Sequence, residues 1–300
     1  MGGCARLKSA LLIPHTGKEV PYLIHPVEPK KVLCIHDLSG MGRCSLAVIL
    51  PVLSVMGVQP VALPTVVLST HTGGLGTPAR LDGCAYGEQA LEHYHALGVE
   101  FDCIYTGYLG GEDQVALAEK AFALWPAAKK IVDPVMGDNG EVYSSYTPEM
   151  CTRMRELCAI ADLITPNTTE AAILLGRDPA SAPQSEREAE EWMRALYEEY
   201  GASVVLTGLD YEPGRVGSGC LENGELTISL HERIDCYYPG TGDVFAAVML
   251  GALLSGAKLR DACVKAGEFV RDTIAYTAQQ GTDPNFGVQF EKLLPYLWQK

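Results

Sequence analysis

The feature that most constrains the fold of this chain is a repeated alternation of short apolar runs with longer stretches of helical spacing. The apolar runs have the length and composition of buried strands, and several of them end in glycine or polar residues. They cover residues 31–35, 61–68, 101–106, 130–132, 163–165 and 203–206. Strands that alternate with helices in this way form a mostly parallel sheet with helices on both faces. The sequence therefore predicts an α/β fold with one central sheet.

Helical spacing and local signals predict the elements between and after these strands. Helices are expected over residues 43–56, 86–97, 114–124, 148–160, 188–200, 260–278 and 289–298. Residues 211–219 are predicted as a glycine-bearing loop, and residues 220–226 as a hairpin with an Asn223-Gly224 turn. Pro64 interrupts the second strand, which favours an edge or irregular position for that strand.

Residues 1–30 differ in pattern from the rest of the chain. They include Pro14, Pro21 and Pro26 and show no sustained period, so we expect an N-terminal extension whose role the pattern does not specify. Residues 31–300 are expected to form a single domain, because no linker-like stretch and no internal repeat divides them.

The net charge and the cysteine pattern exclude several partners. A net charge of −14 argues against nucleic acid or an anionic membrane as the partner. A small anion such as ATP can still be bound, because local N–H donors and a metal ion outweigh distant charge. The chain has 10 cysteines without a C-x-x-C pair or a signal peptide, which is typical of reduced thiols in a cytoplasmic protein. No apolar run reaches the length of a membrane span.

The stretch Gly240-Thr241-Gly242-Asp243 carries the strongest chemical signal. Its glycines let backbone N–H groups converge, and the apolar helix expected behind it adds unpaired donors and a positive dipole end. These are the components of an anion site. A carboxylate beside bound phosphate has a purpose if Asp243 takes a proton from an alcohol while the loop stabilises a transferred phosphoryl group. The alternative for this stretch alone is an ordinary N-capping turn.

Three carboxylates are expected to meet at the carboxyl edge of the sheet. Asp133 closes one predicted strand, Glu170 lies shortly after another, and Asp243 opens a helix after a third. Oxygen ligands at that edge suit Mg²⁺ with retained waters. Each acid alone is more ordinary as a helix cap or a solvated loop residue, so the metal hypothesis depends on their combination.

The first strand also ends in a stretch from which α/β proteins bind ligands, His36-Asp37-Leu38-Ser39-Gly40. It is neither a Walker A loop nor a G-x-G-x-x-G motif. Asp37 is predicted either to touch the ligand or to cap the next turn, and His36 to be a packed strand-end residue. In the loop 69–76, after the second strand, Thr72 is the expected ligand contact.

Taken in order, these motifs resemble those of the ribokinase-like superfamily and, within it, the pyridoxal kinases. The superfamily motifs are Asp133-Pro134-Val135-Met136-Gly137-Asp138, then Thr165-Pro166-Asn167 with Glu170, then Gly240-Thr241-Gly242-Asp243. The narrower resemblance is carried by Thr70-His71-Thr72-Gly73, Thr106-Gly107-Tyr108 and Gly242-Asp243-Val244-Phe245-Ala246-Ala247. It covers the chain from about residue 31 to its end.

The resemblance implies an ATP-dependent kinase that phosphorylates the 5′-hydroxymethyl group of pyridoxal, pyridoxine or pyridoxamine. Asp243 would be the base that activates this hydroxyl, and the N–H groups of Gly240, Thr241 and Gly242 would form the anion hole for the γ-phosphoryl group. A monovalent cation such as K⁺ is a common partner in the family. Members of the family typically form dimers, so a homodimer is expected.

The resemblance also implies which residues hold the ligands. Mg²⁺ and the ATP phosphates would be held, partly through water, by Asp133, Glu170, Thr165 and Asn167. The nucleotide would contact Thr207 and Gly208, and the pyridine pocket would be lined by Thr72 and Tyr108.

One residue departs from the family pattern. Many pyridoxal kinases carry a serine at the end of the first strand, where it meets the ring nitrogen, and this chain has Asp37. A changed preference among the pyridine alcohols would follow, or a different substrate such as hydroxymethylpyrimidine, whose kinases share the fold and chemistry. A non-catalytic binder of pyridoxal or nucleotide is a third reading, disfavoured because Asp133, Glu170 and Asp243 are all present.

Overall fold

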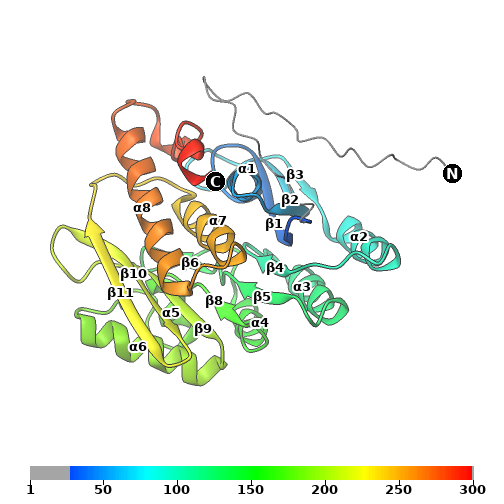
Figure 1. Ribbon diagram of the computed structural model, residues 1–300, viewed down its shortest axis with the longest axis horizontal. Helices are drawn as coiled ribbons and strands as arrows, with labels where there is room; N and C mark the ends of the chain where they lie inside the picture. Colours follow the sequence, from blue (N-terminus) through cyan, green and yellow to red (C-terminus); the bar gives the residue numbers. More distant parts are fainter. Residues whose placement is uncertain (1–27, 299–300) are drawn as a thin grey trace, which may run out of the picture.

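A computed structural model describes residues 28–298, in which helices cover both faces of a central sheet (Figure 1). The strands follow the order β11-β10-β9-β8-β5-β4-β1-β2-β3. Their bounds are β1 (Lys31–Met41), β2 (Gln59–Thr70), β3 (Arg80–Asp82), β4 (Cys103–Thr106), β5 (Lys129–Val132), β8 (Leu163–Ile164), β9 (Ser203–Leu209), β10 (Arg215–Glu222) and β11 (Glu225–Glu232). All neighbours from β2 through β1, β4, β5 and β8 to β9 are parallel, which confirms the predicted mostly parallel α/β sheet.

The helices divide between the two faces. The bounds are α1 (Leu46–Val55), α2 (Cys84–Ala96), α3 (Glu112–Leu124), α4 (Pro148–Cys158), α5 (Thr168–Leu174), α6 (Glu186–Tyr200), α7 (Thr241–Leu254) and α8 (Leu259–Ala278). A small hairpin of β6 (Gly137–Asp138) and β7 (Glu141–Val142) lies outside the main sheet. One apolar core packs α2 to α6 against the sheet, and the other packs α1, α7 and α8 against its opposite face.

The central strand β1 is covered on both faces, and this explains why its first residues form an unbroken apolar run. Leu33 and Ile35 belong to the first core, Val32 and Cys34 belong to the second, and all four side chains are fully buried. Side chains alternate between the faces of a strand, so a strand covered on both sides must be apolar at every position.

The strand β1 is longer than the sequence indicated, and this corrects two predictions. It continues from residue 36 to Met41, with a register shift against β2 between His36 and Leu38, and α1 begins only at Leu46 rather than at residue 43. Hydrogen bonds to β2 hold this polar half of the strand, which composition alone presents as a loop. The second strand is irregular, as Pro64 suggested, but it is not an edge strand, because β3 pairs with it.

Glycines caused the other wrong assignment in the sheet. Residues 215–219 belong to the antiparallel strand β10 and not to a loop, whereas the Asn223-Gly224 hairpin turn is confirmed. A Cβ at Gly217 would lie 1.9 Å from the carbonyl oxygen of Ser229 and one at Gly219 would lie 2.6 Å from Met193. Glycine at these positions lets backbone and helix approach closely, which is its ordinary role inside strands.

The expected second C-terminal helix is also wrong. Residues 289–298 form turns and a short 3₁₀ helix, Leu294–Leu297. Pro295 has no backbone N–H and would break a regular helix here. Of the predicted N-terminal extension, residues 1–27 lie outside the described residues.

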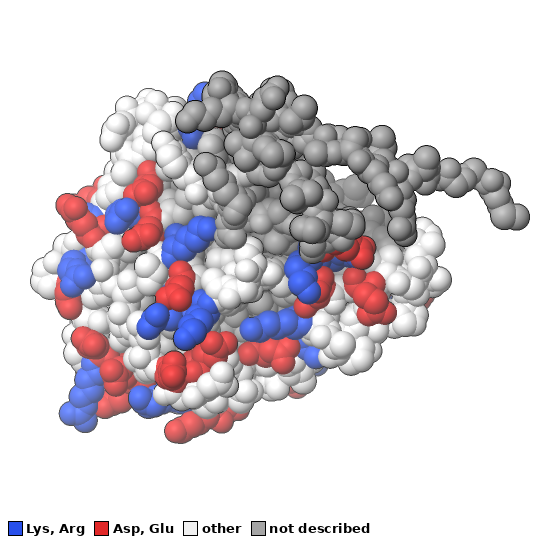
Figure 2. All heavy atoms as spheres, viewed as in Figure 1, with Lys and Arg blue, Asp and Glu red and all other residues white. Residues whose placement is uncertain are grey.

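The described residues also show how charge is distributed on the surface and which cysteines are free. In the part of the chain that the structure describes, no helix is both long and apolar enough to span a membrane. The face seen in Figure 2 carries Lys and Arg side chains interspersed with Asp and Glu among the described residues. The described cysteines are all free thiols, most of them buried.

Candidate active site

The candidate site lies at the carboxyl ends of β1 and β4, where the strand order reverses. Along the chain the sheet grows from β1 to β2 on one side and then from β1 to β4 on the other. Such a topological switch point leaves a crevice outside the carboxyl ends of the strands, and α/β proteins bind their ligands there. The predicted site residues on β1, β5 and α7 all converge on this edge.

The glycine loop leads directly into α7. Gly240 is the N-cap with φ 81°, and a Cβ there would lie 2.0 Å from the carbonyl oxygen of Arg43, so this position requires glycine. At Gly242 a Cβ would meet no protein atom within 4 Å. The space beside Gly242, at the N-terminus of an apolar helix whose first N–H groups have no intrahelical acceptor, is therefore open to an anion.

The turn before α1 packs against this loop and against the C-terminal segment. The N–H of Arg43 donates to the carbonyl of Phe286 at 3.1 Å, and a Cβ at Gly287 would lie 2.8 Å from the Arg43 carbonyl oxygen. Three segments that are far apart in the sequence therefore meet at one turn.

The carboxylate of Asp243 is held from two sides. The backbone N–H of Ser45 donates to its Oδ2 at 2.7 Å, and Nε2 of His36 lies 3.2 Å from its Oδ1, bent away from ideal hydrogen-bond geometry. Ser45 has φ 55° and ψ −143°. Such a conformation costs a non-glycine residue about 1–3 kcal/mol and is concentrated at functional sites. Strained backbone here directs an N–H group at the acid.

His36 is the site residue that the sequence did not reveal. It was predicted to be a packed strand-end residue, and it is packed, with 2% of its surface exposed, but between two carboxylates. Its Nδ1 lies 2.9 Å from Oδ1 of Asp37. Burial lowers the pKa of His36, but the contacts with Asp243 and Asp37 outweigh burial and raise the pKa from 6.5 to about 10.

Asp37 lies differently from the prediction. It is inside β1 and buried, its Oδ1 faces His36, and its Oδ2 accepts a hydrogen bond from the hydroxyl of Ser39 at 3.0 Å. It does not cap the next helix, whose N-cap is Ser45. Burial raises the pKa of Asp37, but the bond and the charge of His36 outweigh burial, so the net pKa is lowered. Both carboxylate oxygens of Asp37 therefore already contact protein groups, although Asp37 was expected to meet a pyridine nitrogen.

Asp133 stands at the end of β5, within the influence of Asp243. The hydroxyl of Tyr105 donates to its Oδ2 at 3.2 Å. Burial, and then the negative charge of Asp243, raise the pKa of Asp133 to about 7. The buried hydroxyls of Thr165 and Thr106 have no hydrogen-bond partner among the described residues. Unpaired buried hydroxyls beside crowded carboxylates are groups that a ligand would satisfy.

Glu170 and Asn167 form a capping box at the start of α5. Asn167 Oδ1 accepts from the N–H of Glu170 at 2.9 Å, and Glu170 Oε2 accepts from the N–H of Asn167 at 2.8 Å. Glu170 Oε1 also accepts from Met136, and Asn167 donates to the carbonyl of Gly137 at 2.9 Å. Burial, and then the charge of Asp133, raise the pKa of Glu170 well above its ordinary value. The pair fixes the loop after β5 and leaves few free lone pairs on Glu170.

Three of the remaining predicted residues lie beside neighbouring strand ends. The N–H of Thr207 donates to the carbonyl of Pro166 at 3.0 Å, next to Asn167, and Gly208 follows with φ 75°. Tyr108 follows β4, and its hydroxyl donates to Ser145 at 3.0 Å. The structure therefore brings Thr207 and Gly208 to the Asn167 side of the site and Tyr108 to the β4 side.

Thr72 is the predicted residue that the structure leaves outside the cluster. It is exposed on the loop after β2. Its neighbour His71 is the buried one, and its Nε2–H donates to the carbonyl of Asn285 at 2.6 Å. Of these two neighbours, His71 is therefore the one that the protein anchors.

Comparison with protein families finds a match over most of the chain. Residues 50–287 match the model of the phosphomethylpyrimidine kinase family. A pyridoxine/pyridoxal/pyridoxamine kinase of Bordetella avium is 29% identical over 261 residues, which are 82% of this chain and 85% of the relative. A pyridoxal kinase of Ovis aries is 29% identical over 66% of this chain and 69% of its own length.

Solved structures of kinases are also similar to this chain over most of its length. The pyridoxal kinase of Lactobacillus plantarum superimposes with a TM-score of 0.83 at 34% identity, covering 89% of this chain and 96% of its own. A Bacteroides thetaiotaomicron protein described as a phosphomethylpyrimidine kinase, in a crystal form with pyridoxal, gives 0.85 at 36% identity, with coverage of 91% and 96%.

Proposed function

Because the chain belongs to the phosphomethylpyrimidine kinase family, we propose that it is an ATP-dependent kinase whose substrate is pyridoxal, pyridoxine or pyridoxamine. The product is the 5′-phosphate of these alcohols. The names of its relatives support the pyridine alcohols over hydroxymethylpyrimidine, and the Bacteroides crystal form contains pyridoxal itself. The intact set of carboxylates disfavours a non-catalytic binder.

The observation that carries this proposal is the placement of Asp243 in the first turn of α7, beside the open space at Gly242. The carboxylate takes the proton as the O–H bond of the alcohol breaks. The alcohol oxygen then forms its bond to the γ-phosphorus, while the bond from that phosphorus to the bridging oxygen breaks and ADP leaves. The N–H groups of Gly240, Thr241 and Gly242 stabilise the charge on the transferred group.

The chain also offers groups that suit Mg²⁺. Bound Mg²⁺ would neutralise developing phosphate charge. Asp133 and the unpaired hydroxyl of Thr165 would hold it, and Glu170 and Asn167 would act through water, because their own oxygens already accept backbone N–H groups. The crowding of buried acids at this edge, which raises the pKa of both Asp133 and Glu170, supports this assignment.

The remaining roles follow the positions of the residues. Thr207 and Gly208 contact the nucleotide from the end of β9, Tyr108 lines the pyridine pocket from the end of β4, and Thr72 contacts the pyridine alcohol from the exposed loop after β2. Asp37 acts inside the protein rather than on the pyridine ring. Residues 31–300 act as one kinase domain in a cytoplasmic homodimer, with K⁺ as an activating cation.

A coupled assay of ADP formation tests the function directly. Wild-type protein with Mg·ATP should phosphorylate at least one of the three pyridine alcohols with a kcat/KM well above that for hydroxymethylpyrimidine. A higher value for hydroxymethylpyrimidine would overturn the substrate assignment. Light scattering after gel filtration reports the dimer, and replacing K⁺ by tetramethylammonium reports the cation.

A further inference from the structure

His36 lies at the centre of the charged groups of the site, and the reaction above assigns it no role. Its ring lies between two acids, with Nδ1 2.9 Å from Oδ1 of Asp37 and Nε2 3.2 Å from Oδ1 of Asp243. All three groups are largely shielded from water, with side-chain exposures of 2% for His36, 7% for Asp37 and 14% for Asp243. Charges at such depth are retained only when they are paired.

The contacts of the ring limit where the protons of this cluster lie. Nδ1 and Oδ1 of Asp37 are both acceptors unless one of them carries a proton, and two bare acceptors do not stay 2.9 Å apart in a buried site. The backbone N–H of Asp37 also donates toward Nδ1 at 2.9 Å, and it is the one contact of the ring that favours a bare Nδ1. The pKa of His36 is raised and that of Asp37 is lowered, so the proton belongs to the ring. Because Nε2 also faces a carboxylate oxygen, Oδ1 of Asp243 at 3.2 Å, the contacts favour a proton on each ring nitrogen, which is the imidazolium form.

The ring is also fixed mechanically. A Cβ at Gly107 would lie 1.9 Å from both Cδ2 and Nε2 of His36, so the Gly107 backbone rests against the imidazole. Tyr105 stands on β4 with its ring centroid 6.3 Å from that of His36. The hydroxyl of Ser39 holds the other oxygen of Asp37. Each group around the imidazole restricts rotation of the ring.

We propose that His36, held by Asp37, is a positioning residue that fixes the carboxylate of Asp243 in the orientation needed to accept the substrate proton. The role of Asp243 as base rests on the proposed function. His36 restrains Oδ1 from β1 while the N–H of Ser45 restrains Oδ2 from the start of α1. The plane of the carboxylate is thereby set by two contacts from outside its own helix. Gly107 is glycine because the ring needs its space.

The kinetic test uses His36→Gln, with the exposed His93→Gln on α2 as a matched control. His36→Gln should lower kcat by about 10²-fold, the loss usual for a misplaced reactive group. The KM for ATP should stay within about twofold, because His36 contacts neither the glycine loop N–H groups nor the Asn167 side of the site. Gly107→Ala changes no polar group but displaces the ring, and it should lower kcat in the same way. Normal turnover in both variants would overturn the proposal.

A spectroscopic arm does not depend on activity. In ¹⁵N-histidine-labelled wild-type protein, one imidazole should remain doubly protonated at pH 8, and its signal should be missing in His36→Gln. Asp37→Asn should lower the pH at which that imidazole titrates, because the ring loses its counter-ion. The groups that face the ring are Asp37, Asp243, Tyr105 and, behind Tyr105, Asp133. A neutral His36 at pH 8 would overturn the proposal.

The two arms separate this proposal from the function. If the wild-type protein phosphorylates none of the alcohols, the proposed function fails while the labelled ring still reports the imidazolium. If Asp243→Asn abolishes turnover and His36→Gln does not affect it, the function stands and the positioning role is wrong.

Discussion

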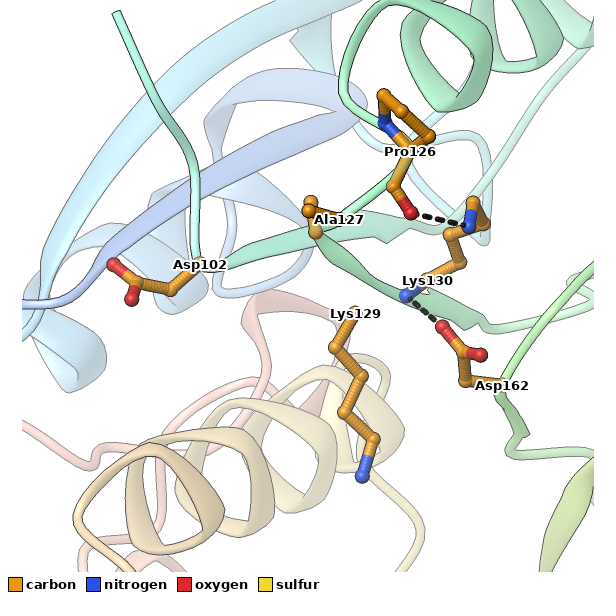
Figure 3. A pocket seen from close by; sticks show the side chains of 7 residues that line it. Asp102, Pro126, Ala127, Lys129, Lys130 and Asp162 are labelled. Atoms are coloured by element: carbon orange, nitrogen blue, oxygen red, sulfur yellow. Dashed lines mark hydrogen bonds between the residues drawn. The ribbon is translucent and has the colours of Figure 1, made fainter.

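Both edges of the central sheet carry acidic side chains, but the surroundings of these side chains differ between the two edges. At the amino edge, Asp102 and Asp162 flank an open depression of about 400 Å³ lined with Lys129 and Lys130 (Figure 3). At the carboxyl edge, Asp133 and Asp243 face a space in which His36 is their close cationic neighbour.

Each acid at the amino edge has donors of its own. Asp102 pairs with the ammonium of Lys30 at 2.7 Å and accepts from the N–H of Lys31 at 2.8 Å, and Asp162 accepts from the N–H of Lys130 at 2.7 Å. Burial raises the pKa of Asp102, but the bonds to Lys30 and Lys31 outweigh burial and lower the net pKa. These acids fix the beginnings of β1 and β5.

At the carboxyl edge, the pKa of an aspartate shifts in the opposite direction. The pKa of Asp133 is raised because it is buried near a second acid, and the nearby hydroxyl of Thr165 makes no geometrically well-formed hydrogen bond to any described residue. Asp102 is satisfied by protein donors, whereas Asp133 keeps a like-charge conflict that a bound cation would relieve. The opposite pKa shifts of Asp102 and Asp133 thus distinguish an acid that protein donors satisfy from an acid that is buried near a second acid.

The largest expected effect is that of Asp243→Asn. The amide keeps the shape of the carboxylate and loses its basicity, so kcat should fall by about 10²–10⁴-fold while ATP binding is retained. Steady-state kinetics and a nucleotide-binding titration measure the two quantities. Turnover within a few-fold of wild type would show that Asp243 is not the base.

The second effect concerns the metal and compares one acid from each edge. Asp133→Ala should raise the Mg²⁺ concentration for half-maximal rate by about 10–100-fold, and Asp162→Ala should leave it unchanged. Glu170→Ala should raise it less, and should also lose about 1 kcal/mol of stability with the capping box. An unchanged Mg²⁺ dependence in both carboxyl-edge variants would remove these acids from the metal site.

The third comparison uses two glycines of one loop. Gly242→Ala meets no protein atom, so the melting temperature should hold while kcat/KM for ATP falls by at least about tenfold, because the methyl group enters the anion site. Gly240→Ala should instead lower the melting temperature, because φ there is 81° and its Cβ would meet the Arg43 carbonyl. Wild-type kinetics in Gly242→Ala would mean that phosphate does not bind beside it.

The smallest effect is expected at the amino edge. Asp102→Asn should lower the free energy of unfolding at pH 7 by about 0.5–1 kcal/mol, a value limited by solvent screening, with unchanged kinetics. Because the pKa of Asp102 is lowered below 3.8 on folding, this stabilisation is present above pH 3.8 and is lost as the pH falls further. Urea unfolding at pH 7 and pH 3 measures the difference, which should shrink at pH 3. A kinetic defect would contradict a purely structural role.

The sequence predicted the fold because strand–helix alternation is a local pattern repeated along the chain, and the observed helices mostly begin and end within a few residues of the predicted bounds. The glycine loop and the convergence of Asp133, Glu170 and Asp243 were also readable, since parallel strands end at one edge. The glycines of β10 and the polar half of β1 were misread, because their pairing partners lie far away in the sequence.

The position of His36 between two acids could not be read from residue types. A histidine after a short apolar run is ordinary, and its partner Asp243 is distant in the sequence. The available signal was indirect: His36-Asp37 follow the apolar part of β1, Thr106-Gly107 follow the apolar run of the adjacent strand β4, and a glycine at the second position leaves room for a ring at the first.

The contacts of the turn at Arg43 and Ser45 determine how late in its synthesis the chain can become active. Ser45 and Asp243 are 198 residues apart, and Arg43 and Phe286 are 243 residues apart. A ribosome releases β1 and α1 long before it releases the acid that they hold and the segment that closes over the turn. A nascent chain at that stage therefore contains the histidine and the serine but not the base, and it cannot turn over nucleotide until synthesis is almost finished. Chains truncated before residue 287 should be inactive even where the sheet has formed.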